Sequence, residues 1–145
     1  MKFRLIIDES CEEEIAAKVH SANDLTAKIE DLVLSYVGSD EINVYGDYEI
    51  LTLKFKDIEC ITVIDRKVYV IDNRANKFRT SGTLSDIEKA LPSYFIRINK
   101  SCLANERKIA CFKTSFSGAV DAVFKCGYKD YVSRRCFAEI KRRYK

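Results

Sequence analysis

The chain has little of what loops and linkers are made of: one proline and five glycines in 145 residues. Disordered segments are rich in such residues and poor in apolar ones, whereas apolar residues make up 47% of this sequence. We therefore expect an ordered domain, because a chain of about 150 residues is long enough to bury a core.

Long apolar runs are also missing. No run approaches the roughly 20 residues that a membrane-spanning helix needs. The N-terminus, MKFRLIIDESCEEE, has no signal-peptide core and becomes acidic within a few residues. These absences predict a cytoplasmic protein that does not insert into a membrane.

Metal ligands are sparse or scattered. Six cysteines are present, but no two form a CxxC pair, and His20 is the only histidine. A zinc site needs closely spaced Cys or His ligands, so we expect no bound metal and no cofactor. In the cytoplasm the cysteines are expected to stay reduced and to act as small apolar side chains.

Common active-site motifs are absent too. The sequence has no GxSxG, no P-loop and no HExxH. The three consecutive glutamates at 12–14 cannot all face one site from a regular element, and a solvated surface explains them better. We therefore expect no enzymatic activity and no small-molecule substrate.

What is present is an uneven distribution of charge. Residues 97–145 hold 13 Lys or Arg against 4 Asp or Glu, whereas residues 1–96 hold 12 against 18. A basic C-terminal third suits a protein that binds a polyanion. A solvated basic surface without a ligand would give the same counts, so charge alone leaves both interpretations open.

Residues 1–41 are predicted to form a strand–helix appendage. Residues 3–7, FRLII, have the composition of a short strand. A helix is expected to begin at Ser21, because S-A-N-D has capping-box spacing, and to end at Gly38. Its apolar stripe consists of Leu25, Ile29, Leu32, Val33 and Tyr36.

From residue 42 onward the pattern is that of a mainly β domain. Strands are predicted at 42–46, 49–55, 58–65, 67–72, 95–98, 102–104, 109–116, 119–125 and 129–133. A short helix is expected between Thr83, its N-cap, and Pro92, and a basic helix follows Ser133. Cys136, Phe137, Ile140 and Tyr144 share one face of that last helix.

Cations and small polar groups occur at three places where strands end. These segments are Arg66-Lys67, Asn99-Lys100-Ser101 and Ser133-Arg134-Arg135. Arg and Lys reach guanine edges and phosphates, Asn and Ser reach adenine edges and phosphate oxygens, and a helix N-terminus adds backbone donors. The alternative is three ordinary polar surface turns.

The stretch FIRINKSCLAN, residues 95–105, resembles the signature of the LytTR DNA-binding domain. KDIECITVIDRKVYVI and GTLSDIEKALPSYF upstream, and NERKIACF and GYKDYVSRRCFAEIKRRY downstream, resemble other segments of that family in the same order. The resemblance covers about residues 42–145. It implies a bacterial transcription-factor module with an elongated stack of antiparallel sheets and short helices, α+β overall, which here follows the appendage at residues 1–41.

The function that this resemblance implies is sequence-specific binding of double-stranded DNA by a transcriptional regulator. Such domains insert loops into successive major grooves, usually at paired direct repeats. By position, Arg66 or Lys67, Lys100 and Arg134 would read bases, while Ser101, Ser133 and Arg135 would contact phosphates. Arg97 would contact a phosphate or brace the structure. Asn99, which stands where the family often has His, is also predicted to contact DNA, and Asn105 would bond to backbone.

Several alternatives remain open. The apolar face of the N-terminal helix is expected either to pack on the β domain or to join two subunits, because paired repeats need two copies. The domain could instead have lost DNA binding and act as a protein-interaction module that antagonises another regulator. A redox sensor using Cys102 or Cys136 is a further alternative. RNA binding is less favoured, since no aromatic pair typical of RNA-binding sheets is evident.

Overall fold

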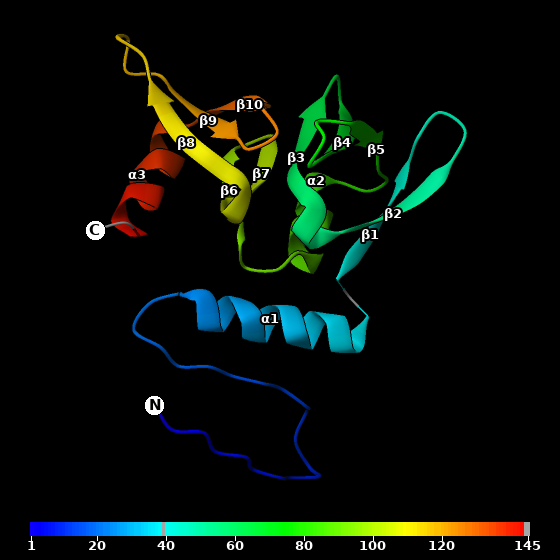
Figure 1. Cartoon of the computed structure of the whole chain (residues 1–145), viewed down its shortest axis with the longest axis vertical. Helices are drawn as coiled ribbons and strands as arrows, with labels where there is room; N and C mark the ends of the chain where they lie inside the picture. The colour runs from blue at the N-terminus through cyan, green and yellow to red at the C-terminus, as the bar shows by residue number, and fades with distance from the viewer. Residues whose placement is uncertain (39, 144–145) are drawn as a thin grey trace.

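The computed structural model describes residues 1–38 and 40–143. This part of the chain forms three α-helices, ten strands and two short 3-10 helices (Figure 1). Their bounds are α1 Asp24–Val37, β1 Glu41–Tyr45, β2 Ile50–Lys54, η1 Phe55–Asp57, β3 Ile58–Ile64, β4 Lys67–Asp72, β5 Lys77–Arg79, α2 Leu84–Ala90, β6 Phe95–Asn99, β7 Cys102–Asn105, η2 Glu106–Lys108, β8 Ile109–Thr114, β9 Val120–Phe124, β10 Lys129–Val132 and α3 Arg134–Arg143.

The strands form two antiparallel sheets, which confirms the prediction of a mainly β domain. The larger sheet has the order β2-β1-β5-β4-β3-β7-β6, and the smaller has the order β10-β9-β8. In Figure 1 the smaller sheet and α3 lie together on one side of the larger sheet, and α1 lies below both. The prediction missed β5, because three residues, KFR, are too few to show an alternating pattern.

Two apolar clusters hold these layers together. On one face of the larger sheet, Ile61 and Leu103 pack with Leu84 and Ile87 of α2. On the other face, a second cluster brings β-sheet residues onto the smaller sheet and α3; its members include Ile71, Ile98, Phe124 and Ile140. Each large side chain buried in this way stabilises the fold by roughly 1.5–3 kcal/mol. The larger sheet is therefore the middle layer of the domain.

The N-terminal segment differs from the prediction. Residues 1–20 contain no helix or strand, so the strand expected at 3–7 is wrong. A strand needs a partner for its backbone hydrogen bonds, and this segment runs below α1, away from both sheets (Figure 1). Its apolar side chains lie in solvent, with Phe3 91% and Ile7 84% exposed.

The helix α1 begins two residues later than predicted. Its N-cap is Asn23, whose side-chain Oδ1 accepts from Thr26 N at 3.1 Å while Asn23 N donates to Thr26 Oγ1 at 3.0 Å. This reciprocal pair is a capping box, so Asn23 replaces the expected Ser21. Gly38 ends the helix with a φ of 70°, as predicted, since glycine adopts this left-handed conformation at little cost.

The helix α1 docks on the β domain through charged side chains. The carboxylate of Glu30 accepts hydrogen bonds from the backbone N and Oγ of Ser93, and Asp31 Oδ2 lies 3.0 Å from Arg107 Nη1. The Arg107 guanidinium also stacks on the Tyr94 ring, 3.8 Å from its centroid. The predicted apolar stripe is only partly covered: Ile29 and Val33 are half-buried, while Leu25, Leu32 and Tyr36 are exposed.

The caps of the other two helices agree with the sequence prediction. Thr83 Oγ1 accepts from Asp86 N at 3.2 Å to start α2, and Ser133 Oγ accepts from Cys136 N at 3.2 Å to start α3. Tyr144, expected on the apolar face of the last helix, lies outside the described residues. Within the part of the chain that is described, none of the helices has the length and hydropathy to cross a membrane.

Candidate nucleic-acid interface

The three polar segments singled out in the sequence lie at one edge of the domain. Val63 N at the end of β3 donates to Ser101 O in the β6–β7 turn at 2.8 Å. Ser133 N at the start of α3 donates to Ile98 O of β6 at 2.8 Å. The β3–β4 loop, the β6–β7 turn and the N-terminus of α3 are thus connected by backbone hydrogen bonds. Three segments that are far apart in the sequence therefore lie side by side at this edge.

A half-buried carboxylate also joins these segments. Asp130 of β10 accepts hydrogen bonds from Thr62 Oγ1 of β3 at 3.3 Å and from Asn99 Nδ2 of β6 at 3.2 Å. The same Asn99 amide donates to Tyr131 O at 2.8 Å and its Oδ1 accepts from Ser101 N at 2.8 Å. The side chains of Asp130 and Asn99 therefore link the two sheets and the β6–β7 turn.

Asn99 lies beneath this surface. Only 2% of the residue is exposed, and both ends of its amide are hydrogen-bonded inside the protein. The structure thus places Asn99 under the turn that carries Lys100, where it orders the turn. Its predicted contact with DNA would require those internal bonds to be exchanged.

Arg97 braces the same turn from the opposite face of β6. Its Nε lies 3.0 Å from Glu88 Oε2 of α2, and its Nη1 donates to Lys100 O at 2.7 Å. The backbone of Lys100 is therefore held while its side chain extends into solvent. Of the two roles predicted for Arg97, structural bracing is the one seen here.

In the β3–β4 loop, backbone conformation rather than side-chain bonding exposes the basic residues. Asp65 and Arg66 have φ angles of 51° and 64°, and Ile64 pairs directly with Lys67. Two residues with positive φ between paired strands form a mirror-image turn that matches the twist of the sheet. Arg66 and Lys67 are both exposed. In residues 1–38 and 40–143, neither side chain forms an ion pair or hydrogen bond.

The start of α3 supplies the third basic segment. The hydroxyl of Ser133 already accepts a hydrogen bond as the helix cap. The phosphate contact predicted for Ser133 would therefore come from the backbone N–H groups of the first helical turn. Arg134 and Arg135 are both exposed. Arg135 has only a loose pair with Glu139, at 3.9 Å, and Arg134 has no partner among the described side chains. Both guanidinium groups are therefore available to a ligand.

Asn105 is confirmed as a residue that bonds to backbone. Its Nδ2 donates to Ile58 O at 2.9 Å, and its Oδ1 accepts from Arg107 N at 3.0 Å. It is 1% exposed and ties the end of β7 to the start of β3. This asparagine supports the sheet from the end opposite to the polar segments.

The cysteines show no sign of a shared site. Cys102 is fully buried, and a hydrogen bond with Cys60 together with burial raises the pKa of its thiol. A raised pKa leaves little thiolate, which is the reactive form, so the environment of Cys102 does not favour redox sensing. Cys136 is half-buried. Across the described ranges, no three His, Cys, Asp or Glu side chains are close enough to hold a metal ion.

Comparison with known proteins shows the family of the chain. The family model described as the LytTr DNA-binding domain matches residues 48–145. The chain belongs to the LytTR family of DNA-binding domains. The match includes all three polar segments and begins after α1, and it confirms the predicted family.

The LytTR assignment is accompanied by relatives that match almost the whole chain. An uncharacterized HTH-type transcriptional regulator of Staphylococcus aureus (strain bovine RF122 / ET3-1) is 32% identical over 145 residues, covering 99% of this chain and 97% of the relative. A protein of the same description from strain NCTC 8325 / PS 47 is 31% identical with the same coverage. Residues 1–41 are therefore shared with these relatives.

The fold comparison points the same way. The solved LytTr DNA-binding domain of a Bacillus cereus protein superposes with a TM-score of 0.65 at 17% identity, covering 72% of this chain and 96% of the other. The fold is thus that of a LytTR domain. In the described residues no two α-helices follow each other without intervening strands, so the relatives' description as HTH-type has no matching motif here.

Proposed function

We propose that this chain is a sequence-specific regulator of transcription that binds double-stranded DNA by inserting two β-turns and a helix N-terminus into successive major grooves. The observation that carries the proposal is the single edge at which Arg66, Lys100 and Arg134 all extend into solvent without an ion-pair partner among the described residues. Unpaired cations at one edge suit a polyanion, and Arg and Lys are the residues that read guanine in the major groove.

The proposed roles follow from exposure. Lys100, Arg134 and Arg66 or Lys67 would contact base edges, because their side chains are free to extend. Arg135, Ser101 and the first turn of α3 would contact phosphates. Arg97 and Asn99 would act indirectly, by positioning the turn that carries Lys100. A regulator of bacterial genes would work in the cytoplasm, and we include that location in the proposal.

Selection of bound DNA from a random pool tests this function. We expect a recovered consensus whose affinity exceeds that for a scrambled duplex by at least tenfold at physiological salt. A consensus repeated in direct orientation would support paired sites. Failure to retain any duplex or genomic fragment would reject DNA binding and favour the alternative, a protein-interaction module that antagonises another regulator.

We also propose that α1 joins two copies of the chain. The helix uses Glu30 and Asp31 to dock on its own β domain, which leaves Leu32 69% and Tyr36 90% exposed on another side. An exposed apolar stripe on a helix is covered when it pairs with a second copy. Sedimentation analysis should show a dimer that Leu32→Asp converts to a monomer. A wild-type protein that stays monomeric at the concentrations that bind DNA would contradict this.

A further inference from the structure

One row of side chains crosses the larger sheet on the face that the smaller sheet covers. In strand order the directly paired residues are Asn99, Cys102, Thr62, Tyr69, Arg79 and Tyr45. Direct partners in a sheet share one face, so these side chains are neighbours. The first half of the row lies under β10, where Asn99 and Thr62 bond to Asp130. The second half, from Tyr69 to Tyr45, extends beyond the smaller sheet.

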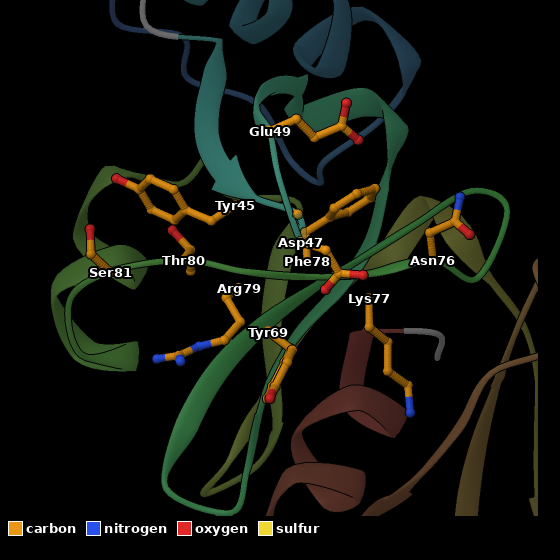
Figure 2. A pocket seen from close by; sticks show the side chains of 11 residues that line it. Tyr45, Asp47, Glu49, Tyr69, Asn76, Lys77, Phe78, Arg79, Thr80 and Ser81 are labelled. Atoms are coloured by element: carbon orange, nitrogen blue, oxygen red, sulfur yellow. The ribbon is translucent and has the colours of Figure 1, made fainter.

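The uncovered half of the row lines a surface hollow (Figure 2). Arg79 and Lys77 are exposed cations on β5, and Tyr45 is 42% exposed. Figure 2 shows Arg79, Tyr69 and Lys77 extending to the same side, with Glu49 of the β1–β2 turn at the opposite end. Lys77 Nζ lies 5.8 Å from the centre of the Tyr128 ring, and Arg79 has no ion pair with any described residue. The hollow thus combines aromatic rings with two cations, Arg79 and Lys77, that form no ion pair with the described residues.

The hollow continues the edge proposed to bind DNA. Lys67 precedes Tyr69 by two residues on β4, and alternate residues of a strand share a face. Arg66 comes immediately before Lys67 at the tip of the same hairpin. A series of cations therefore leads from the loop, through Lys67, to Arg79 beside Tyr69. Asp47 and Glu49, from the β1–β2 turn, also line the hollow, and their negative charge would favour an anion on the β4–β5 side, beside Arg79.

We propose that Arg79, with Tyr69 and Lys67, binds the sugar-phosphate backbone of the same DNA duplex, beside the groove that Arg66 enters. This inference rests on the proposed function. Guanidinium and phenol groups are both regular partners of phosphate oxygens, and such contacts hold the protein in register without reading sequence. Continuity with the β3–β4 loop is what selects DNA over another polyanion as the occupant.

The test measures the affinity of Arg79→Ala for two duplexes, the selected site and a scrambled sequence of equal length, over a series of salt concentrations. We expect both affinities to fall together, by about five- to tenfold near 0.1 M salt, and the slope of log K against log salt to drop by about one unit. Arg79→Lys should keep most of the affinity, since it keeps the charge. Lys28→Ala, an exposed cation on α1, is the control and should leave both affinities unchanged.

The outcomes separate this inference from the proposed function. If Arg66→Ala and Lys100→Ala weaken binding but Arg79→Ala does not, the backbone contact is wrong and the proposed function stands. A loss confined to the selected site would make Arg79 a base reader and would also overturn the backbone assignment. If wild-type protein binds neither duplex, both proposals fail. Unaltered thermal unfolding of Arg79→Ala confirms that any loss reflects the contact.

Discussion

Two turns at the same edge of the larger sheet hold a basic side chain toward solvent, and they are built differently. The β6–β7 turn rests on two side chains of β6: the buried Asn99 bonds to Tyr131 and Ser101, and the half-buried Arg97 holds the carbonyl of Lys100. In the part of the chain that the structure describes, no side chain supports the β3–β4 loop in this way, and its shape follows from the positive φ angles of Asp65 and Arg66. The position of Lys100 therefore depends on residues that are distant in the sequence, whereas the position of Arg66 depends on the backbone conformation of Asp65 and Arg66 themselves.

The largest effect in this comparison is expected from Asn99→Ala. The change leaves the Tyr131 carbonyl, the Asp130 carboxylate and the Ser101 N–H each without one hydrogen-bond partner. We expect a loss of about 2–4 kcal/mol in the free energy of unfolding, measured with urea. Asn73→Ala, at an exposed asparagine, should change it by less than about 0.5 kcal/mol. Equal values for the two variants would mean that the turn does not depend on Asn99.

Lys100→Ala and Arg134→Ala test the two exposed cations that flank this network. Each should cost about 1–3 kcal/mol of binding free energy on the selected site and relax the base preference at one position. Stability should stay within about 0.5 kcal/mol, because neither side chain has a partner among the described residues. Titration of labelled duplexes measures both quantities. An unchanged affinity for the selected site would remove these residues from the proposed interface.

Arg66→Gly should separate stability from binding in the β3–β4 loop. A non-glycine residue in the left-handed region costs about 1–2 kcal/mol, part of which glycine regains despite its greater freedom when unfolded. We expect the free energy of unfolding to rise by roughly 0.5–1 kcal/mol while DNA affinity falls. Arg66→Ala should lower affinity as much without the gain in stability. A glycine variant less stable than the alanine variant would show that the loop is not strained.

Arg135→Ala is expected to have a smaller and different effect. Its guanidinium is exposed and only loosely paired with Glu139, so stability should be unchanged. Binding to all duplexes should weaken to the same extent, and the salt slope should fall by about one unit. A sequence-dependent loss would instead identify Arg135 as a base reader.

The last prediction concerns pH and the opposite side of the molecule. Burial, together with the charge of Asp31, raises the pKa of Tyr94 from 10.0 to about 12. The folded protein then holds a proton that the unfolded chain has released, so this contribution to stability is complete below pH 10 and is lost as the pH rises from 10 to 12. Tyr94→Phe should make stability decline less steeply over that interval. Part of the decline should remain, because burial also raises the pKa of Tyr128. An unchanged slope would contradict the shift.

Most of the fold was predicted from local sequence patterns, and the features that were missed depend on contacts between residues far apart in the sequence. Alternating residues and caps such as Thr83 and Ser133 act within a few positions, so they can be read from one segment. The hydrogen bond between Asn99 and Asp130 joins residues 31 positions apart, and no local pattern predicts it. The strand expected at 3–7 failed for the same reason, since strands depend on a distant partner.

For the interface, the polar residues at strand ends singled out the three basic segments, and the resemblance of FIRINKSCLAN to a known signature favoured DNA binding over ordinary surface turns. Which side chains are free was not predictable. Asn99 and Lys100 are adjacent in the sequence, yet one is buried and the other is in solvent, because the turn rotates successive side chains to opposite sides. Arg79 was missed entirely, since its strand was not recognised.

The carboxylate of Asp130 has a consequence for how such a protein would measure its target. Because one residue fastens β3 and β6 to β10, and Ser133 is bonded to β6 in turn, the three basic segments cannot shift independently. On the proposed function, the domain would therefore present its three contacts to a bound duplex at fixed intervals. If α1 joins two copies, as proposed, any tolerance for different distances between two target sites would come from residues 1–41.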